Sequence, residues 1–172
     1  MKRFTSRQIA LCGIAAGLYA AITVLTAPIA YGGIQFRIAD SLCVLAALQP
    51  ELTVGLTLGC LIANLFSTVS ALDIILGTAA TLLGCLLTRG ITKPLLAPLP
   101  TVLSNACLVG AMLAWLYLPA EMFWKGFALY GAQVAAGELA VGYLLGLPLY
   151  IYMRKSALLE RLIRRDPPEK PR

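Results

Sequence analysis

The stretch ALDIILGTAATLLGCLLTR, residues 71–89, decides what kind of protein this chain is. Its 19 residues carry two charged side chains, Asp73 near the beginning and Arg89 at the end. A helix rises about 1.5 Å per residue, and crossing the hydrocarbon core of a bilayer takes about 20 apolar residues. The stretch therefore predicts a transmembrane helix.

Five further apolar segments predict that this helix belongs to a bundle of six. We place them at residues 8–30, 38–50, 51–67, 95–118 and 124–153. The second and third are short and meet at Gln49-Pro50-Glu51. Two spans joined by a tight turn are favoured over one kinked helix, because proline interrupts a helix and the combined run is too long for one crossing. The expected fold class is an all-α integral membrane protein.

The composition of the whole chain agrees with this class. Of the 172 residues, 59% are hydrophobic and 13% are charged, and the mean hydropathy is +0.82. A soluble domain averages about 45–50% apolar and about 25% charged residues. We therefore expect one transmembrane domain over residues 1–153 and a basic tail over residues 154–172.

The distribution of basic residues predicts the orientation in the membrane. Twelve of the 14 lysines and arginines lie before the first span, between the fourth and fifth, or after the sixth. Cytoplasmic segments carry an excess of such residues, so both termini are expected in the cytoplasm, with only Arg37 and Lys125 outside. The net charge is +6, but the basic residues form no compact patch, so no nucleic-acid partner is expected.

Several kinds of chemistry are missing from the sequence. The chain has no histidine, which excludes histidine acid–base catalysis and the usual histidine-containing metal sites. It has no P-loop sequence that would bind ATP, and its five cysteines lie singly in separate apolar segments. We therefore expect no enzyme activity, no metal site and no cofactor in this chain.

A few polar side chains lie inside or beside the predicted spans, where they are costly. A charged group at the centre of a transmembrane helix costs about 2.5–3.5 kcal/mol on insertion scales. The candidates for ligand binding are Glu138, Asn105, Asp73, Asn64 and Gln133, with Gln35 and Arg37 in the first loop. The alternatives are structural: hydrogen bonds between helices, a helix cap at Asp73, or a pair between Arg37 and Asp40.

Small residues recur at helical spacing in the first span. Gly13 and Gly17 are four residues apart, and so are Ala16 and Ala20. Faces of this kind let two helices approach closely. They either pack within the bundle or dock on another membrane protein.

Five motifs, in this order along the chain, resemble the QueT family. They are YGGIQFRIADSL (31–42), GCLIANL (59–65), DIILGTAATLL (73–83), LAPLPTVLSNA (96–106) and the pair Gly137-Glu138. The likeness runs from about residue 5 to 153 and departs at Asp40, where glutamate would be expected. QueT proteins are substrate-binding (S) components of energy-coupling factor (ECF) transporters, linked to the uptake of queuosine precursors.

The resemblance implies a six-helix S-component fold in the bacterial plasma membrane that binds a 7-deazaguanine from outside. It implies a membrane coupling protein and two cytoplasmic ATPases as partners, which would use the ATP. The first helix would dock on the coupling protein, with Ala16 and Ala20 as the better match and Gly13 and Gly17 as competitors. The alternatives are an S component for another vitamin or nucleobase, a stand-alone ion-coupled carrier, a small membrane enzyme and a structural subunit.

Overall fold

A computed structural model of the chain describes residues 4–31 and 35–156, and every regular element among these residues is a helix. In chain order they are α1 (Ser6–Leu25), α2 (Ala27–Ala30), η1 (Ile38–Ala47), α3 (Leu52–Asn64), α4 (Ala71–Thr88), η2 (Pro94–Leu96), α5 (Leu99–Tyr117), η3 (Ala120–Met122), α6 (Phe123–Val141), η4 (Gly142–Gly146) and α7 (Leu147–Lys155). The expected all-α class is confirmed. The tail expected over residues 154–172 lies outside the described residues from residue 157 onward.

Within the described part of the chain, four helical stretches are long and apolar enough to cross a bilayer: Ser6–Leu25, Ala71–Thr88, Pro94–Tyr117 and Ala120–Lys155. The other two expected spans are present as shorter apolar helices, Ile38–Ala47 and Leu52–Asn64. Six helical arms therefore follow the six predicted segments, while the number of complete crossings stays a prediction.

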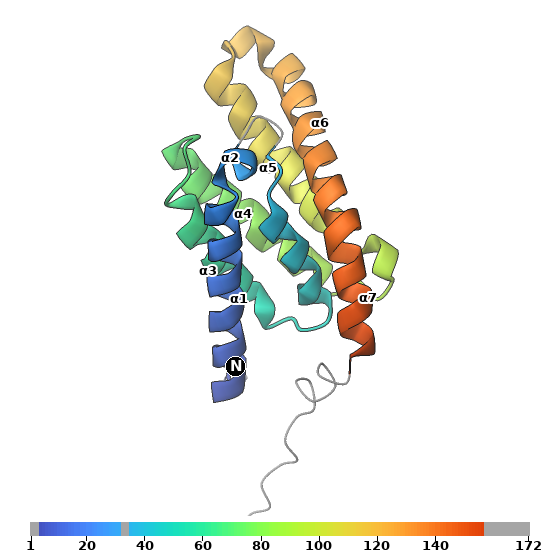
Figure 1. Cartoon of the computed structure of the whole chain (residues 1–172). Helices are drawn as coiled ribbons and strands as arrows, with labels where there is room; N and C mark the ends of the chain where they lie inside the picture. The colour runs from blue at the N-terminus through green and yellow to red at the C-terminus, as the bar shows by residue number, and fades with distance from the viewer. Residues whose placement is uncertain (1–3, 32–34, 157–172) are drawn as a thin grey trace, which may run out of the picture.

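The short helix η1 is the innermost arm of the bundle. It is a 3-10 helix, which rises about 2.0 Å per residue and is uncommon beyond three or four residues. Seven of its ten residues are buried, and it contacts α1, α3, α4 and the α6–α7 helix. Figure 1 shows η1 running down the inside of the molecule to the turn that joins it to α3, which returns upward.

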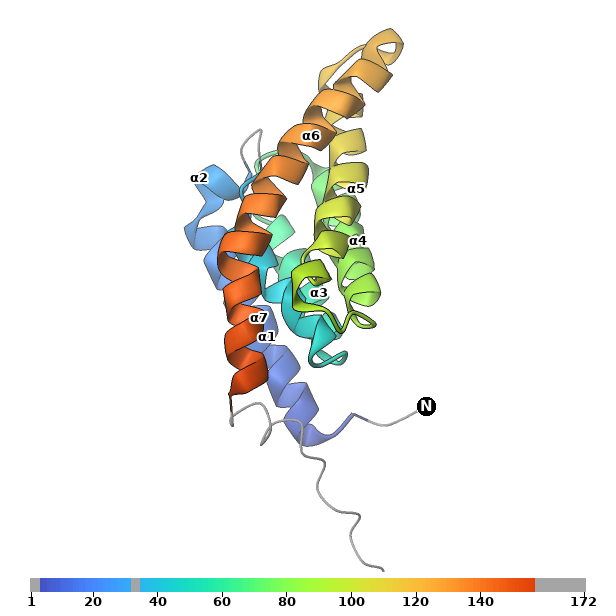
Figure 2. The same ribbon diagram turned by 90° about the vertical axis from the view of Figure 1, so that its right-hand side faces the viewer.

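The last arm is one continuous helix from Phe123 to Lys155 with a π-helical turn, η4, in its middle. Figure 2 shows it along the length of the molecule, with α5 beside its upper half. The π turn precedes Pro148, which has no N–H to donate to a normal helical bond. At its end Gly146 lets η1 approach, since a Cβ there would lie 3.1 Å from Val44 Cγ1 and 3.2 Å from the Ser41 carbonyl oxygen.

The start of α1, the turn between η1 and α3 and the end of α7 lie at one end of the molecule (Figures 1 and 2). The connection between α5 and α6 lies at the opposite end. Both described chain ends are thus on the same side of the bundle, as an even number of crossings requires.

Glycines set the closest helix contacts. A Cβ at Gly59 of α3 would lie 2.6 Å from the carbonyl oxygen of Ala16 and 2.8 Å from Tyr19 Cβ in α1. A Cβ at Gly110 of α5 would lie 2.6 Å from the Cα of Gly131 in α6. Neither helix pair could keep this spacing with a larger side chain at these positions.

We predict that Gly59→Ala lowers the thermal stability of the purified protein, while the matched change Gly17→Ala does not. The added methyl group at Gly59 meets backbone atoms that cannot rotate away, whereas a Cβ at Gly17 meets nothing within 4 Å. Overpacking of this kind costs about 1–3 kcal/mol. Thermal unfolding in detergent tests the pair, and equal midpoints for both variants would contradict the α1–α3 packing.

Candidate functional site

Six polar side chains, from five helices and the connection before η1, meet inside the bundle, and we call them the buried polar cluster. Each is at most 4% exposed. They are Arg37, Asp40, Asn64, Asp73, Asn105 and Glu138. Five of the seven side chains predicted to bind a ligand belong to it, together with Asp40.

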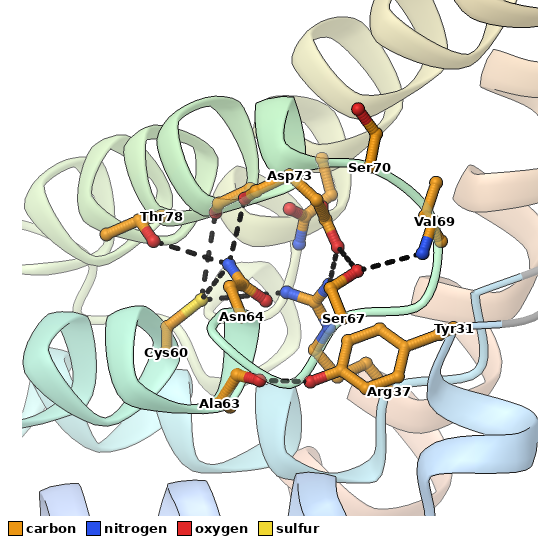
Figure 3. Close-up of polar contacts among 12 residues, drawn as sticks. Tyr31, Arg37, Cys60, Ala63, Asn64, Ser67, Val69, Ser70, Asp73 and Thr78 are labelled. Atoms are coloured by element: carbon orange, nitrogen blue, oxygen red, sulfur yellow. Dashed lines mark hydrogen bonds and ion pairs between the residues drawn. The ribbon is translucent and has the colours of Figure 1, made fainter.

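Arg37 and Asp73 form the ionic part of the cluster. Arg37 precedes η1, and its Nη2 lies 3.7 Å from Oδ2 of Asp73, the third residue of α4 (Figure 3). The same Oδ2 accepts a 2.7 Å hydrogen bond from Ser67 Oγ. The cap of α4 is Ser70, whose side chain accepts from Leu72 N, so Asp73 is not the helix cap. Arg37 pairs across the bundle with Asp73 rather than along its own segment with Asp40.

Tyr31 supports Arg37 from the other side. The guanidinium carbon of Arg37 lies 5.8 Å from the centre of the Tyr31 ring, within cation–π range. The Tyr31 hydroxyl donates a 2.5 Å hydrogen bond to the carbonyl oxygen of Ala63 (Figure 3). Burial raises the pKa of the Tyr31 phenol above its usual value, which keeps it a neutral donor. Tyr31 thus links the segment before η1 to the end of α3.

Asn64, the last residue of α3, joins α3 to α4. Its Nδ2 lies 3.1 Å from the carbonyl oxygen of Asp73 and 3.3 Å from both Thr78 Oγ1 and Cys60 Sγ (Figure 3). Gly77 makes room for this contact, because a Cβ there would lie 2.6 Å from Asp73 Oδ1 and 2.9 Å from Asn64 Nδ2. A larger residue at position 77 would push apart the two side chains that face it.

The remaining three side chains meet deeper in the bundle. Nδ2 of Asn105 in α5 donates to Oε1 of Glu138 in α6 at 3.0 Å and lies 3.3 Å from Oδ2 of Asp40 in η1. The other oxygen of Asp40 accepts a short hydrogen bond from the hydroxyl of Tyr19 in α1. One amide therefore bridges two carboxyl groups from different helices.

Several buried atoms of the cluster have no hydrogen-bond partner among the described residues. They are Arg37 Nε, Asn64 Oδ1, Asp73 Oδ1 and Asn105 Oδ1, and Nε2 of buried Gln35 is in the same state. A buried polar group without a partner costs about 1–3 kcal/mol, so each needs an explanation. Together these atoms offer both donors and acceptors, as the recognition of a polar ligand requires.

Two predicted side chains lie apart from the cluster contacts. Gln133 is half-buried on α6, five residues before Glu138 and so on another face of the helix, and the described residues show no contact between it and the cluster. Gln35 is buried beside Arg37 with a φ of 49°, a conformation that few residues other than glycine adopt. Gln35 could contact a ligand through its side-chain amide nitrogen, which has no partner among the described residues.

Sequence reasoning missed several side chains that complete the cluster. Tyr19 and Cys60 lie within apolar helices and carry no signal at the level of sequence. Asp40 was weighed as a partner of Arg37 and as a departure from the family motif, but it was not proposed to bind a ligand. Its spacing gives no hint of Asn105 or Glu138, which lie far along the chain. The described residues hold no group of three histidine, cysteine or acidic side chains that could bind a metal ion.

The small residues exposed on α1 are not the pair that matched the family's docking pattern better, Ala16 and Ala20. Ala16 is 9% exposed and packs on Gly59 of α3. Gly13 and Gly17 face open space, with nothing within 4 Å of an added Cβ. Ala20 is half-buried. The pair of small residues that a second membrane protein can reach is therefore Gly13 and Gly17.

Comparisons with known proteins identify the family. The model of the QueT transporter family matches residues 9–155. A protein of Lactococcus lactis subsp. cremoris (strain MG1363) named "Queuosine precursor transporter QueT" is 34% identical over 84 residues, 48% of this chain and 49% of that protein. The chain thus matches about half the length of this curated relative. No solved structure matches the chain.

We predict that Arg37→Met destabilises the protein by about 3–5 kcal/mol, because Asp73 is then left buried without its counter-ion. The double variant Arg37→Met/Asp73→Leu should recover part of this loss, since it removes both charges of the pair. Thermal or denaturant unfolding of the two single variants and the double variant gives the coupling. Strictly additive losses would contradict the ion pair.

Proposed function

The chain belongs to the QueT transporter family, and we propose that it is the substrate-binding subunit of an ATP-driven ECF importer that takes up a 7-deazaguanine precursor of queuosine. The observation that carries this proposal is the buried polar cluster with its unpartnered donors and acceptors. Polar groups at this depth of an apolar bundle are costly and in membrane proteins commonly mark the path of a substrate.

The chemistry of the cluster suits a guanine-like ring. Such a ring presents adjacent N–H donors on one edge and a carbonyl oxygen beside them. A carboxylate can accept both N–H groups, and an amide or guanidinium nitrogen can donate to the carbonyl. Glu138, Asp73 and Asp40 provide carboxylates, while the unpartnered nitrogens of Arg37 and Gln35 provide donors.

The position of the cluster supports binding from outside the cell. Asn64 ends α3 and Asp73 begins α4, at the end of the molecule away from the described chain termini (Figure 1). With both termini in the cytoplasm, as the basic residues predict, this end faces outward. A ligand entering there would meet Arg37, Asn64 and Asp73 first.

A partner must supply the ATP-driven step, because this chain carries no P-loop. We propose a transmembrane coupling protein with two cytoplasmic ATPases, as in ECF transporters, and place the docking face on α1 at Gly13 and Gly17. The open space at both glycines supports this choice over Ala16. Ile14 and Leu18 beside them are 67% and 48% exposed and would contribute apolar contact area.

The proposed ligand predicts a selective binding profile. The purified wild-type chain, without ATP or partners, should bind a 7-deazaguanine at least about tenfold more tightly than thiamine, riboflavin or biotin. Asn105→Ala should weaken this binding by about tenfold or more, since a lost hydrogen bond to a charged group costs about 1.5–3 kcal/mol.

Isothermal titration of folded, monodisperse protein is the measurement. Glu121→Gln is the control, because it removes a carboxylate from an exposed position on η3. Tighter binding of one of the three vitamins would show an S component with another substrate. Uptake in cells that lack the ATPases would instead favour a lone carrier.

The docking face gives a separate prediction. Gly13→Leu/Gly17→Leu should keep the affinity for substrate but abolish uptake in cells that express the partners, because a bulky face cannot be approached closely. Ala16→Leu should instead lower the stability of the chain itself, because Ala16 packs on Gly59. Normal uptake by the double glycine variant, at wild-type expression, would rule out this face.

A further inference from the structure

We propose that Asp40, Asn105 and Glu138 form the part of the binding site that receives a positively charged primary amine on the substrate. This inference rests on the proposed function and divides its site into two parts with different tasks. Asp73, the third buried carboxylate, then stabilises the fold through its ion pair with Arg37 and does not bind the amine.

The first argument is the balance of buried charge. The buried residues that the structure describes include three carboxylates, Asp40, Asp73 and Glu138, but a single basic side chain, Arg37. An ionised carboxylate in an apolar interior is unfavourable unless it is paired. One guanidinium can balance one carboxylate, so the cluster has an acidic excess that a cationic ligand would neutralise.

The second argument is that Asp73 is the carboxylate that already has partners. Its Oδ2 lies 3.7 Å from Arg37 Nη2 and accepts from Ser67 Oγ at 2.7 Å. By contrast, the Asp40 and Glu138 carboxyl groups lie within hydrogen-bonding reach of each other, and none of the described basic side chains lies between them. Their other recorded side-chain hydrogen bonds come from neutral groups: the Asn105 amide, the Tyr19 hydroxyl and the Cys43 thiol. The acidic excess therefore lies on the Asp40–Glu138 side of the cluster.

The third argument is the number and direction of acceptors. A primary ammonium has three N–H donors and no acceptor. Asp40 Oδ2 and Glu138 Oε1 both lie within 3.3 Å of Asn105 Nδ2, and Oδ1 of the same amide is buried without a partner. The carboxyl groups of Asp40 in η1 and Glu138 in α6 thus converge on the amino group of Asn105 in α5, which occupies the place that the ammonium of a ligand would take. Tyr19 holds the other oxygen of Asp40 and so fixes the direction of its carboxylate.

The experiment compares two ligands that differ in charge at one position. The probes are 7-(aminomethyl)-7-deazaguanine and its 7-(hydroxymethyl) analogue, which is close in size but neutral. The wild-type protein should bind the amine at least about tenfold more tightly, since charge-assisted hydrogen bonds are roughly twice as strong as neutral ones. The ratio of the two dissociation constants is independent of the fraction of protein that is folded.

Variants assign the preference to residues. Glu138→Gln and Asp40→Asn should each reduce the ratio by about tenfold or to near one, whereas Asp40→Glu should keep it because the charge is retained. Asp73→Asn should weaken both ligands by a similar factor and leave the ratio unchanged. Glu121→Gln, at an exposed position, should change neither affinity.

Each outcome decides the proposal. Equal binding of both probes by the wild type would overturn the amine site while leaving the proposed substrate class standing. Binding of neither probe by folded protein would overturn both. A ratio that survives Glu138→Gln and Asp40→Asn but collapses in Asp73→Asn would move the amine to Asp73 and contradict the assignment. If Glu138→Gln and Asp40→Asn do not fold, Asp73→Asn decides: an unchanged ratio supports the assignment, and a collapsed ratio contradicts it.

Discussion

The burial of charge within an apolar bundle is the constraint on which the rest of this structure depends. Arg37 lies 2% exposed and Asp73 fully buried, 3.7 Å from each other. Their attraction offsets the loss of water only if the remaining donors and acceptors are also placed. Tyr31, Asn64 and Ser67 provide that placement, and in doing so they tie the segment before η1 to the end of α3 and the start of α4.

Small residues are what allow this arrangement. Gly59 brings α3 against α1, Gly110 and Gly131 bring α5 against α6, and Gly77 leaves room for the Asn64 and Asp73 side chains. The innermost helix η1 can then lie among its neighbours and deliver Asp40 to Asn105 and Glu138. The polar contacts inside the bundle therefore depend on the close backbone packing that these glycines allow.

Much of this fold follows from hydrophobic runs alone. The six predicted segments agree with the observed helical arms to within a few residues at most ends, because run length and Pro50 mark where helices begin and end. Polar side chains within apolar runs could also be identified from the sequence, and five of these candidates meet in the buried polar cluster. Their partners could not be predicted, since Tyr19 to Asp40 and Asn105 to Glu138 are contacts between distant parts of the chain.

Other features of the fold are beyond sequence patterns for a physical reason. Spacing shows which residues share a helix face, but not which face turns inward, so Ala16 was favoured for docking although it packs on Gly59. The 3-10 form of η1 left no trace in composition, because its apolar residues would suit an α-helix equally well.

The central claim is that the buried polar cluster binds the substrate. An experimental structure of the chain with 7-(aminomethyl)-7-deazaguanine bound tests this most directly. The account predicts the ring inside the bundle, with the amine at hydrogen-bonding distance, about 2.7–3.2 Å, from Glu138 and Asp40. A ligand bound on the outer surface of the helices, with the contacts among Asp40, Asn105 and Glu138 unchanged, would contradict it.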